Sequence, residues 1–384
     1  MKLAMVLMVR DEADIIEDNV RYHRAQGVDF FVVGDNGSTD GTVEILERHE
    51  RAGILRLEHV EGDWQGVQTG GQTRIARIAG EMGADWVIHN DADEFWWPLA
   101  GNLKQALAEV PDRFGMVLAP RTEFVARPDG PGTFAERLTV REVGFRRPPR
   151  TAHRAHPQVT LWTSHPIDVW VDRGGTPREG LVGKPAMRQQ ARHVEEAELD
   201  LVLAPRFPVG IYHFPLRSFE QYRRKIEVAA INKWFRHDAE SRAVEEAYEA
   251  GRLDEVYRRL TLDDAQVQAG IGDGWLTEDT RFRDYLRACP EDPGTEPAPP
   301  PPDSSAERRS QDLAELEADA MYALSRYLQT AAYKKQTGRR RQAAQRSRQR
   351  RLRRQVRRLR RRARRIESSR WWRLRPRLPR RGSD

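Results

Sequence analysis

Two patterns of apolar residues alternate along roughly the first ninety positions of the chain. Short, mainly apolar runs, typical of buried strands, occupy positions 3–9, 30–33, 54–57 and 86–88. Stretches with an apolar residue every three or four positions, typical of amphipathic helices, occupy 14–26, 43–46 and 75–82. Gly27 is available as a helix stop, and Asp40 as a helix cap. The alternation predicts an α/β domain with a mainly parallel sheet covered on both faces.

Acidic segments follow three of the expected strands. Arg10-Asp11-Glu12 follows the first strand, residues 35–41 follow the second, and Asp91-Ala92-Asp93-Glu94-Phe95 follows the fourth. In parallel α/β sheets, ligands bind beyond the carboxyl ends of the strands. Asp91 and Asp93 are two positions apart, so in an extended segment they point to the same side. This pair predicts a site for Mg²⁺ or Mn²⁺ bridging phosphate oxygens, and the alternative is an acidic surface loop.

Four sequence blocks carry a family resemblance. They are Met8-Val9-Arg10-Asp11-Glu12, residues 34–42 (Gly-Asp-Asn-Gly-Ser-Thr-Asp-Gly-Thr), Asp91-Ala92-Asp93-Glu94-Phe95, and residues 212–225, which begin Tyr-His-Phe-Pro-Leu-Arg-Ser. In order and spacing they resemble glycosyltransferase family 2-like enzymes of the GT-A fold. The third and fourth blocks resemble the branch whose acidic motif reads Asp-x-Asp-Glu-Phe. The resemblance covers about the first 235 residues. It implies a Rossmann-like catalytic domain acting on a nucleotide-diphosphate sugar.

The resemblance also implies roles for residues that bind the nucleotide. Asp35, at the end of the second strand, would contact the base or ribose. Arg10 and Glu12, at the end of the first strand, would line the same pocket. Asp91 would hold the ribose or a water on the metal.

A second group of residues would act on the diphosphate. The resemblance implies that Asp93, with Asp91 and His213, forms the site of a Mn²⁺ or Mg²⁺ ion bridging the two phosphates. Arg217 and Lys225 would neutralise the departing diphosphate. These roles agree physically, because a metal and cations placed where negative charge accumulates lower the barrier.

An inverting transferase also needs a general base to deprotonate the acceptor hydroxyl. In the parent family this base follows the Asp-x-Asp segment by several tens of residues, often as a Glu-Asp pair, and the expected stretch of this sequence has no such pair. Asp168 and Asp172 are the candidate bases, since they lie at about the right distance in the sequence. Glu123 and Glu136 are the alternatives.

Composition changes along the chain and predicts its organisation. Residues 1–235 form the expected catalytic domain and 236–289 a helical extension, or cap. Residues 290–306 read as a proline-rich linker, and 307–332 as a helix. The single cysteine, Cys289, excludes an internal disulfide framework, and no apolar run approaches the length of a membrane span. We therefore expect a cytoplasmic protein.

The chain ends in an arginine-rich tail, residues 333–384. It holds 24 Lys and Arg against two acidic residues, a net charge of +22, so the chain total of +7 leaves −15 for everything before it. Self-repulsion favours a disordered tail, which can fold as a helix against an anionic membrane, placing the protein on the inner membrane face. Non-specific nucleic-acid binding is a less favoured alternative, and a solubilising tail is another.

The favoured function is metal-dependent glycosyl transfer from a nucleotide-diphosphate sugar to an unknown acceptor, for which lipid-linked and cell-envelope molecules are the candidates. The alternative is a non-catalytic nucleotide- or nucleic-acid-binding protein that uses the basic tail. A nucleotidyltransferase is disfavoured, because Arg10-Asp11-Glu12 stands where a glycine-rich, basic triphosphate loop is expected. The donor's sugar and base, the acceptor, the stereochemistry and the oligomeric state stay open.

Overall fold

The computed structural model describes eight segments of the chain. They are residues 1–62, 70–112, 114–143, 149–157, 159–161, 169–171, 208–231 and 239–290. By its internal contacts the chain divides into two units, Met1–Leu324 and Ser325–Asp384, and every described residue belongs to the first. The expected helix over 307–332 and the arginine-rich tail lie outside the described residues.

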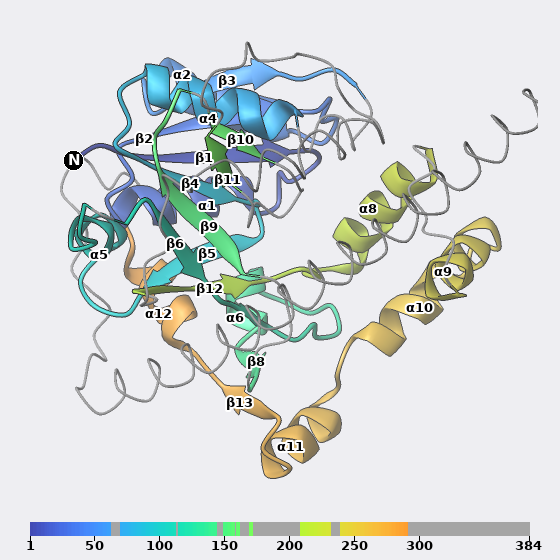
Figure 1. Ribbon diagram of the computed structural model, residues 1–384. Coiled ribbons are helices and arrows are strands. Elements are labelled where there is room, and N and C mark those ends of the chain that lie inside the picture. Colours follow the sequence, from blue (N-terminus) through green and yellow to red (C-terminus); the bar gives the residue numbers. More distant parts are fainter. Residues whose placement is uncertain are drawn as a thin grey trace, which may run out of the picture. The chain divides into compact units, whose positions relative to one another are not determined.

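The centre of the described part is a six-stranded sheet in the order β3-β2-β1-β4-β9-β6 (Figure 1). The strands are β1 (Leu3–Val9), β2 (Phe30–Asp35), β3 (Leu55–His59), β4 (Trp86–Asn90), β6 (Met116–Ala119) and β9 (Arg150–Arg154). The first four are parallel, and β9 is antiparallel to both β4 and β6. The predicted α/β class with a mainly parallel sheet is therefore confirmed.

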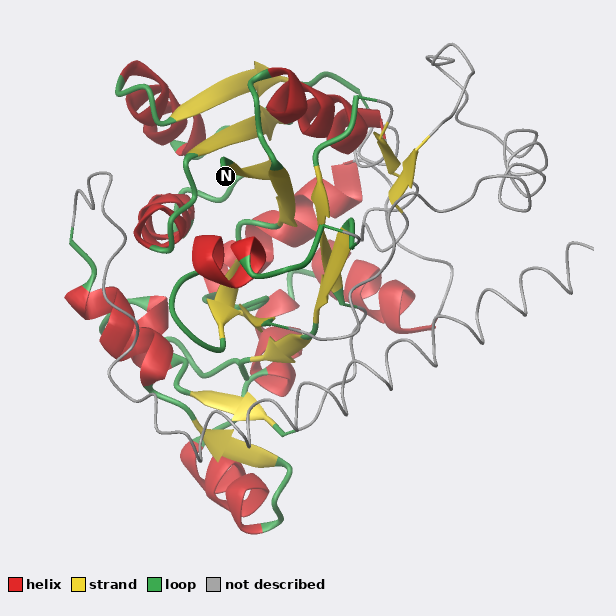
Figure 2. Cartoon of the chain, turned by 60° about the vertical axis from the view of Figure 1, so that its left-hand side comes forward, coloured by secondary structure: helices red, strands yellow, loops and turns green. Residues whose placement is uncertain are grey.

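Helices cover both faces of this sheet (Figure 2). The helices nearest to it in sequence are α1 (Ile16–Ala25), α2 (Thr42–Arg51) and α4 (Gln72–Glu81). Strand β1 shows why both faces need cover, since its side chains alternate between them. Its odd-numbered residues share one core with α1, and its even-numbered residues from Ala4 to Met8 share another with α4. All seven residues of β1 are buried, as the continuous apolar run predicts.

Two details of the helix ends follow from local chemistry. Helix α1 begins at Ile16, two residues later than predicted. Gly27, with φ of +88°, follows its C-cap in the left-handed region that glycine adopts readily. Before α2, the Asp40 carboxylate accepts a hydrogen bond from the Thr42 backbone N–H at 3.1 Å, although Gly41 is the N-cap residue itself.

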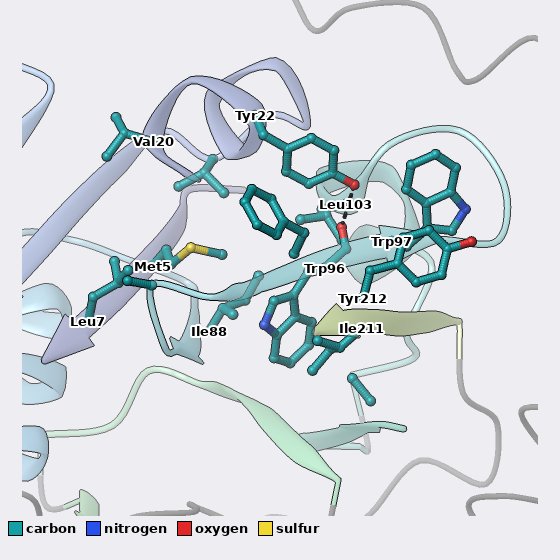
Figure 3. Close-up of a cluster of buried hydrophobic side chains, with 14 of the residues drawn as sticks. Met5, Leu7, Val20, Tyr22, Ile88, Trp96, Trp97, Leu103, Ile211 and Tyr212 are labelled. Carbon is teal, nitrogen blue, oxygen red and sulfur yellow. Dashed lines mark hydrogen bonds between the residues drawn. The ribbon is translucent and has the colours of Figure 1, made fainter. Parts of the chain in front are cut away.

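A second sheet has three strands in the order β5-β12-β7. They are β5 (Glu94–Pro98), β7 (Arg121–Glu123) and β12 (Val209–His213). The central strand, β12, is antiparallel to β5 and parallel to β7. The contact of this sheet with α1 is largely aromatic, because the Tyr22 ring packs against Phe95 and Trp97. Figure 3 shows the Tyr22 hydroxyl donating to the Trp96 carbonyl, at 3.0 Å.

The remaining elements are shorter. They are α5 (Leu103–Ala108), α6 (Phe134–Arg137), β8 (Val140–Glu142), β10 (Val159–Leu161), β11 (Val169–Val171), α8 (Phe219–Ile231), α9 (Ala239–Glu249), α10 (Leu253–Leu260), α11 (Asp264–Gly272), β13 (Leu276–Glu278) and α12 (Arg281–Ala288). The expected extension over 236–289 is mainly helical, but β13 pairs with β8, and Phe282 of α12 is buried in the main core. No described helix is both long and apolar enough to cross a membrane.

Candidate functional site

The loops after β1 and β2 meet at one edge of the central sheet. Val9 and Asp35 are register partners at the ends of these parallel strands. The loops are joined by hydrogen bonds from the Asp11 N–H to Ser38 Oγ at 2.9 Å and from the Thr39 N–H to Asp11 Oδ1 at 2.7 Å. This edge lies at the carboxyl ends of the strands, where an α/β sheet binds its ligands.

Asp35 and Arg10 both lie at this edge, but they differ in their hydrogen-bond partners. Asp35 is buried, and its carboxylate accepts hydrogen bonds from the Gly37 N–H at 3.0 Å and from Ser38 Oγ at 2.5 Å. It therefore shapes the loop whatever else it binds. The Nε atom of Arg10 is buried and makes no hydrogen bond among the described residues. Its ion pair with Asp11 Oδ2, at 3.8 Å, is too long for a hydrogen bond, so a ligand atom could accept one from this donor.

Glu94 is the buried anchor of the acidic segment. It is the first residue of β5, and no part of it is exposed. It accepts hydrogen bonds from Arg150 Nε at 2.7 Å and from Arg121 Nη1 at 2.7 Å. Burial raises the pKa of Glu94, but the two guanidinium groups outweigh burial and lower this pKa to about 2. Glu94 is thus ionised and unavailable to a ligand. The sequence shows Glu94 only as one residue of the Asp-x-Asp-Glu-Phe motif. It does not reveal the two arginine partners, because they lie on strands that are distant in the sequence.

Asp91 is also held by Arg150, whose Nη2 contacts its carboxylate. Its side chain keeps 32 % of its surface exposed, so it can still be reached from solvent. Burial raises the pKa of Asp91, and Arg150 acts in the opposite direction.

Asp93 is surrounded by cations. His213 Nε2 lies 3.4 Å from its Oδ1, and Arg217 Nη1 and Lys225 Nζ each lie 3.9 Å from its Oδ2. Burial raises the pKa of Asp93, but these three groups outweigh burial and hold it far below the usual range. The sequence-predicted residues Asp93, His213, Arg217 and Lys225 therefore do come together. The contacts of these three cations with Asp93 are longer than the 2.6–2.8 Å bonds that His213 and Arg217 make with other carboxylates.

His213 lies between two carboxylates. Its Nδ1 is 2.6 Å from Glu123 Oε2, and its Nε2 faces Asp93. Burial lowers the pKa of His213, but Asp93 and Glu123 outweigh it and raise this pKa to about 9. Glu123, one of the alternative base candidates, is buried and also faces Arg121, with Nε 3.1 Å from its Oε1. Its position is that of a group orienting the imidazole.

The Arg217 side chain is buried and makes its hydrogen bonds within the protein. Only 1 % of its side chain is exposed, and it donates to Glu12 Oε2 at 2.6 Å and to Asp14 Oδ2 at 2.7 Å. Burial raises the pKa of Glu12 to about 7, against the influence of Arg217. Arg217 therefore ties the loop after β1 to the segment after β12. Lys225, on α8, is 59 % exposed and is the cation of this cluster that a ligand can reach.

Of the other base candidates, the structure describes only Glu136. Asp168 and Asp172 lie outside the described residues. Glu136 is exposed and belongs to a capping box with Thr133, where it accepts from the Thr133 N–H at 2.9 Å, and Arg287 Nη2 lies 2.8 Å from its other oxygen.

A divalent ion fits this site with two protein ligands. Within the described segments, no group of three or more His, Cys, Asp and Glu side chains is arranged to hold a metal, so the predicted trio is not preformed. The reason is that Arg150 holds Asp91, whereas Asp93 and His213 face each other across 3.4 Å. Mg²⁺ commonly takes one or two carboxylates and completes its shell with water and substrate phosphates. Asp93 supplies one such carboxylate, and the neutral form of His213 could add a nitrogen ligand through Nε2, the atom that faces Asp93.

The fold and the site define an α/β protein with a charged binding edge. Sequence comparison adds a similarity to a class of enzyme. Residues 6–113 match the sequence profile of glycosyltransferase family 92. The match runs from β1 past α5 and includes the loops that carry Arg10, Asp35 and Asp93. This part of the chain is therefore similar to a glycosyltransferase domain. The narrower family 2-like branch stays a prediction. No curated protein matches the chain.

Solved glycosyltransferase structures are distant from this chain. TarS 1–349 of S. aureus in complex with UDP has a TM-score of 0.31 and 15% identity, covering 66% of this chain and 71% of TarS 1–349. The complex of the same protein with UDP-GlcNAc gives 0.28 and 19%, covering 40% and 46%. Glucosyl-3-phosphoglycerate synthase from Mycobacterium tuberculosis with Mn²⁺, UDP and glucosyl-3-phosphoglycerate gives 0.21 and 18%, covering 31% and 44%.

The chain spans about half the length of a further structure of S. aureus TarS 1–349, of which it covers 47%. TM-scores this low assign no residue and no activity to this chain.

Proposed function

We propose that this protein is a metal-dependent glycosyltransferase that moves a sugar from a nucleotide-diphosphate sugar to an acceptor, with inversion at the anomeric carbon. The observation that carries the proposal is the cluster at Asp93, which joins a buried carboxylate, His213 and an exposed lysine at the carboxyl edge of the sheet. Asp93 lies within the stretch that matches a glycosyltransferase family.

The nucleotide would bind across the joined loops after β1 and β2. Arg10 supplies a buried donor that has no hydrogen-bond partner among the described residues, and Asp35 keeps the second loop in shape through Gly37 and Ser38. Asp91, a third of whose side chain is exposed, would hold the ribose or a metal-bound water. Glu12 lines the same edge and is fixed there by Arg217.

The diphosphate would lie against Asp93, His213 and Lys225. Asp93 and His213 would hold Mn²⁺ or Mg²⁺, which supplies positive charge to the two phosphates as the sugar departs. Lys225 is exposed beside Asp93, so its ammonium group can contact the leaving diphosphate directly. Arg217 would act indirectly, since it is buried and holds Glu12 and Asp14 in place. Such preorganised charge stabilises a transition state without reorganisation at the moment of reaction.

The acceptor side is assigned from the sequence only. Asp168 and Asp172 remain the proposed general bases, because Glu123 is engaged by His213 and Arg121 and Glu136 by its capping box. The tail over 333–384, with its net charge of +22, would bring the enzyme to an anionic membrane on its cytoplasmic side, where lipid-linked or cell-envelope acceptors are found.

The test is donor hydrolysis across a panel of UDP-, GDP-, dTDP- and CDP-sugars with Mn²⁺. We expect one nucleotide class to be hydrolysed, and Asp93→Asn to abolish that hydrolysis. Asp29→Asn is the matched control, because Asp29 lies at the opposite end of the same strands, where it accepts from the Leu3 N–H at 2.7 Å. Nucleotide binding without turnover of any sugar, with or without candidate acceptors, would instead support the non-catalytic alternative.

A further inference from the structure

A ring of alternating charges joins the two aspartates of the acidic segment. In order, its members are Asp91, Arg150, Glu94, Arg121, Glu123, His213 and Asp93. Consecutive members are ion-paired, and the turn between β4 and β5 closes the ring, because Asp91 and Asp93 both belong to it. Every member except Asp91 is buried.

Strand register explains why these residues meet. In the second sheet, His213 of β12 lies opposite Glu94 of β5 on one side and opposite Glu123 of β7 on the other. Directly opposed residues place their side chains on the same face of a sheet. Arg121 is two residues before Glu123 on β7, so it shares that face and reaches Glu94 at 2.7 Å.

Arg150 connects this group to the central sheet. It is the first residue of β9, which pairs with β4 just before the acidic turn. Its Nε donates to Glu94 Oε2 at 2.7 Å, while its Nη2 contacts Asp91. One planar guanidinium therefore holds two carboxylates in a fixed relative orientation, which a lysine cannot do.

We propose that Glu123 and Arg150 are positioning residues of the donor site, acting through His213 and Asp91 respectively. Glu123 fixes the imidazole so that Nε2 faces Asp93, and Arg150 fixes Asp91 against Glu94. This inference rests on the proposed function, because it concerns how the same site receives Mn²⁺ and a nucleoside diphosphate. Carboxylates that orient a ligating histidine affect metal affinity and activity by roughly 10–100-fold when they are replaced.

The experiment compares Glu123→Gln and Arg150→Lys with a control that breaks a similar buried pair outside the ring. Arg141→Lys serves for this purpose, since Arg141 Nε donates to Asp279 Oδ2 at 2.9 Å and both residues are buried. For each protein, calorimetry measures the Kd of UDP in the presence of Mn²⁺, thermal unfolding without ligand measures stability, and donor hydrolysis gives KM and kcat.

We expect Glu123→Gln and Arg150→Lys to weaken Mn²⁺-dependent UDP binding by roughly 10–100-fold. We expect Arg141→Lys to lower the melting temperature while leaving this Kd at the wild-type value. A wild-type Kd in both ring variants would overturn the inference and leave the proposed function standing. Failure of the wild-type protein to bind UDP with Mn²⁺ would overturn both.

A second variant covers the case in which Glu123→Gln does not fold. Glu123→Asp keeps the negative charge but is one methylene shorter, so we expect it to fold and to bind Mn²⁺ and UDP with an intermediate Kd. An affinity equal to that of the wild type would show that the length and direction of the Glu123 side chain do not matter, which contradicts a positioning role.

Discussion

His23 makes the fold sensitive to acid. This residue of α1 is fully buried, and its Nε2 accepts the Trp96 backbone N–H at 3.1 Å. Its Nδ1 must then carry the proton, which it donates to the Asn19 carbonyl at 2.8 Å. Burial lowers the pKa of His23 to about 3, although the Asn19 bond acts in the opposite direction. The imidazole is therefore neutral in the folded protein across the whole physiological range.

The size of the effect follows from linkage. In the unfolded chain the pKa is about 6.5, so between about pH 6.5 and about pH 3 the unfolded state binds a proton that the folded state does not. The contribution of His23 to stability is complete above about pH 6.5 and decreases as the pH falls. Each pH unit below that costs about 1.4 kcal/mol, which amounts to about 3 kcal/mol at about pH 4.5.

The assay is urea unfolding of wild-type protein and His23→Gln at about pH 7 and about pH 4.5. Glutamine does not titrate, and every other ionisable group is common to both proteins. The difference between their acid-induced losses therefore isolates His23. We expect the wild type to lose about 3 kcal/mol more than the variant, whatever the stability of the variant at neutral pH. Equal losses in the two proteins would refute the reasoning.

Three further predictions test other parts of the account. Arg217→Met should cost about 1.5–3 kcal/mol in urea unfolding, because it removes the charge-assisted hydrogen bonds that the buried guanidinium donates to Glu12 and Asp14, and an unchanged midpoint would contradict this role. Gly27→Ala should cost about 1–2 kcal/mol, because a Cβ at φ of +88° would lie 2.9 Å from Lys104 Cβ; an unchanged melting temperature would show that the site is unstrained. Deleting residues 333–384 should abolish sedimentation with anionic vesicles and spare UDP binding, because each basic residue near acidic lipid contributes about 1 kcal/mol; vesicle binding by the truncated protein would rule out the tail as the membrane anchor.

Local patterns were sufficient to predict the first half of the fold. The inner parallel strands β1 and β4 are buried on both faces, so each sequence contains a short continuous apolar run. The strand order then places the segments after β1, β2 and β4 at one edge. The acidic turn and its neighbours could thus be assigned to a shared site before any contact was known.

The partners of the acidic segment could not be predicted in the same way. Arg121 and Arg150 lie on β7 and β9, whose sequences carry no apolar run, and they reach Glu94 only through non-local strand pairing. Arg217 illustrates the same limit. Basic residues are usually exposed, so its burial beneath Glu12 and Asp14 has no sequence signature.

The most direct test of the central claim is the melting temperature of the protein with UDP and Mn²⁺ together. A ligand that binds only the folded state stabilises it by about 2.7 kcal/mol at a hundred times its Kd. The account predicts a clear increase for the wild-type protein and none for Asp93→Ala. No increase in the wild type, or an equal increase in Asp93→Ala, would contradict a donor site built on Asp93.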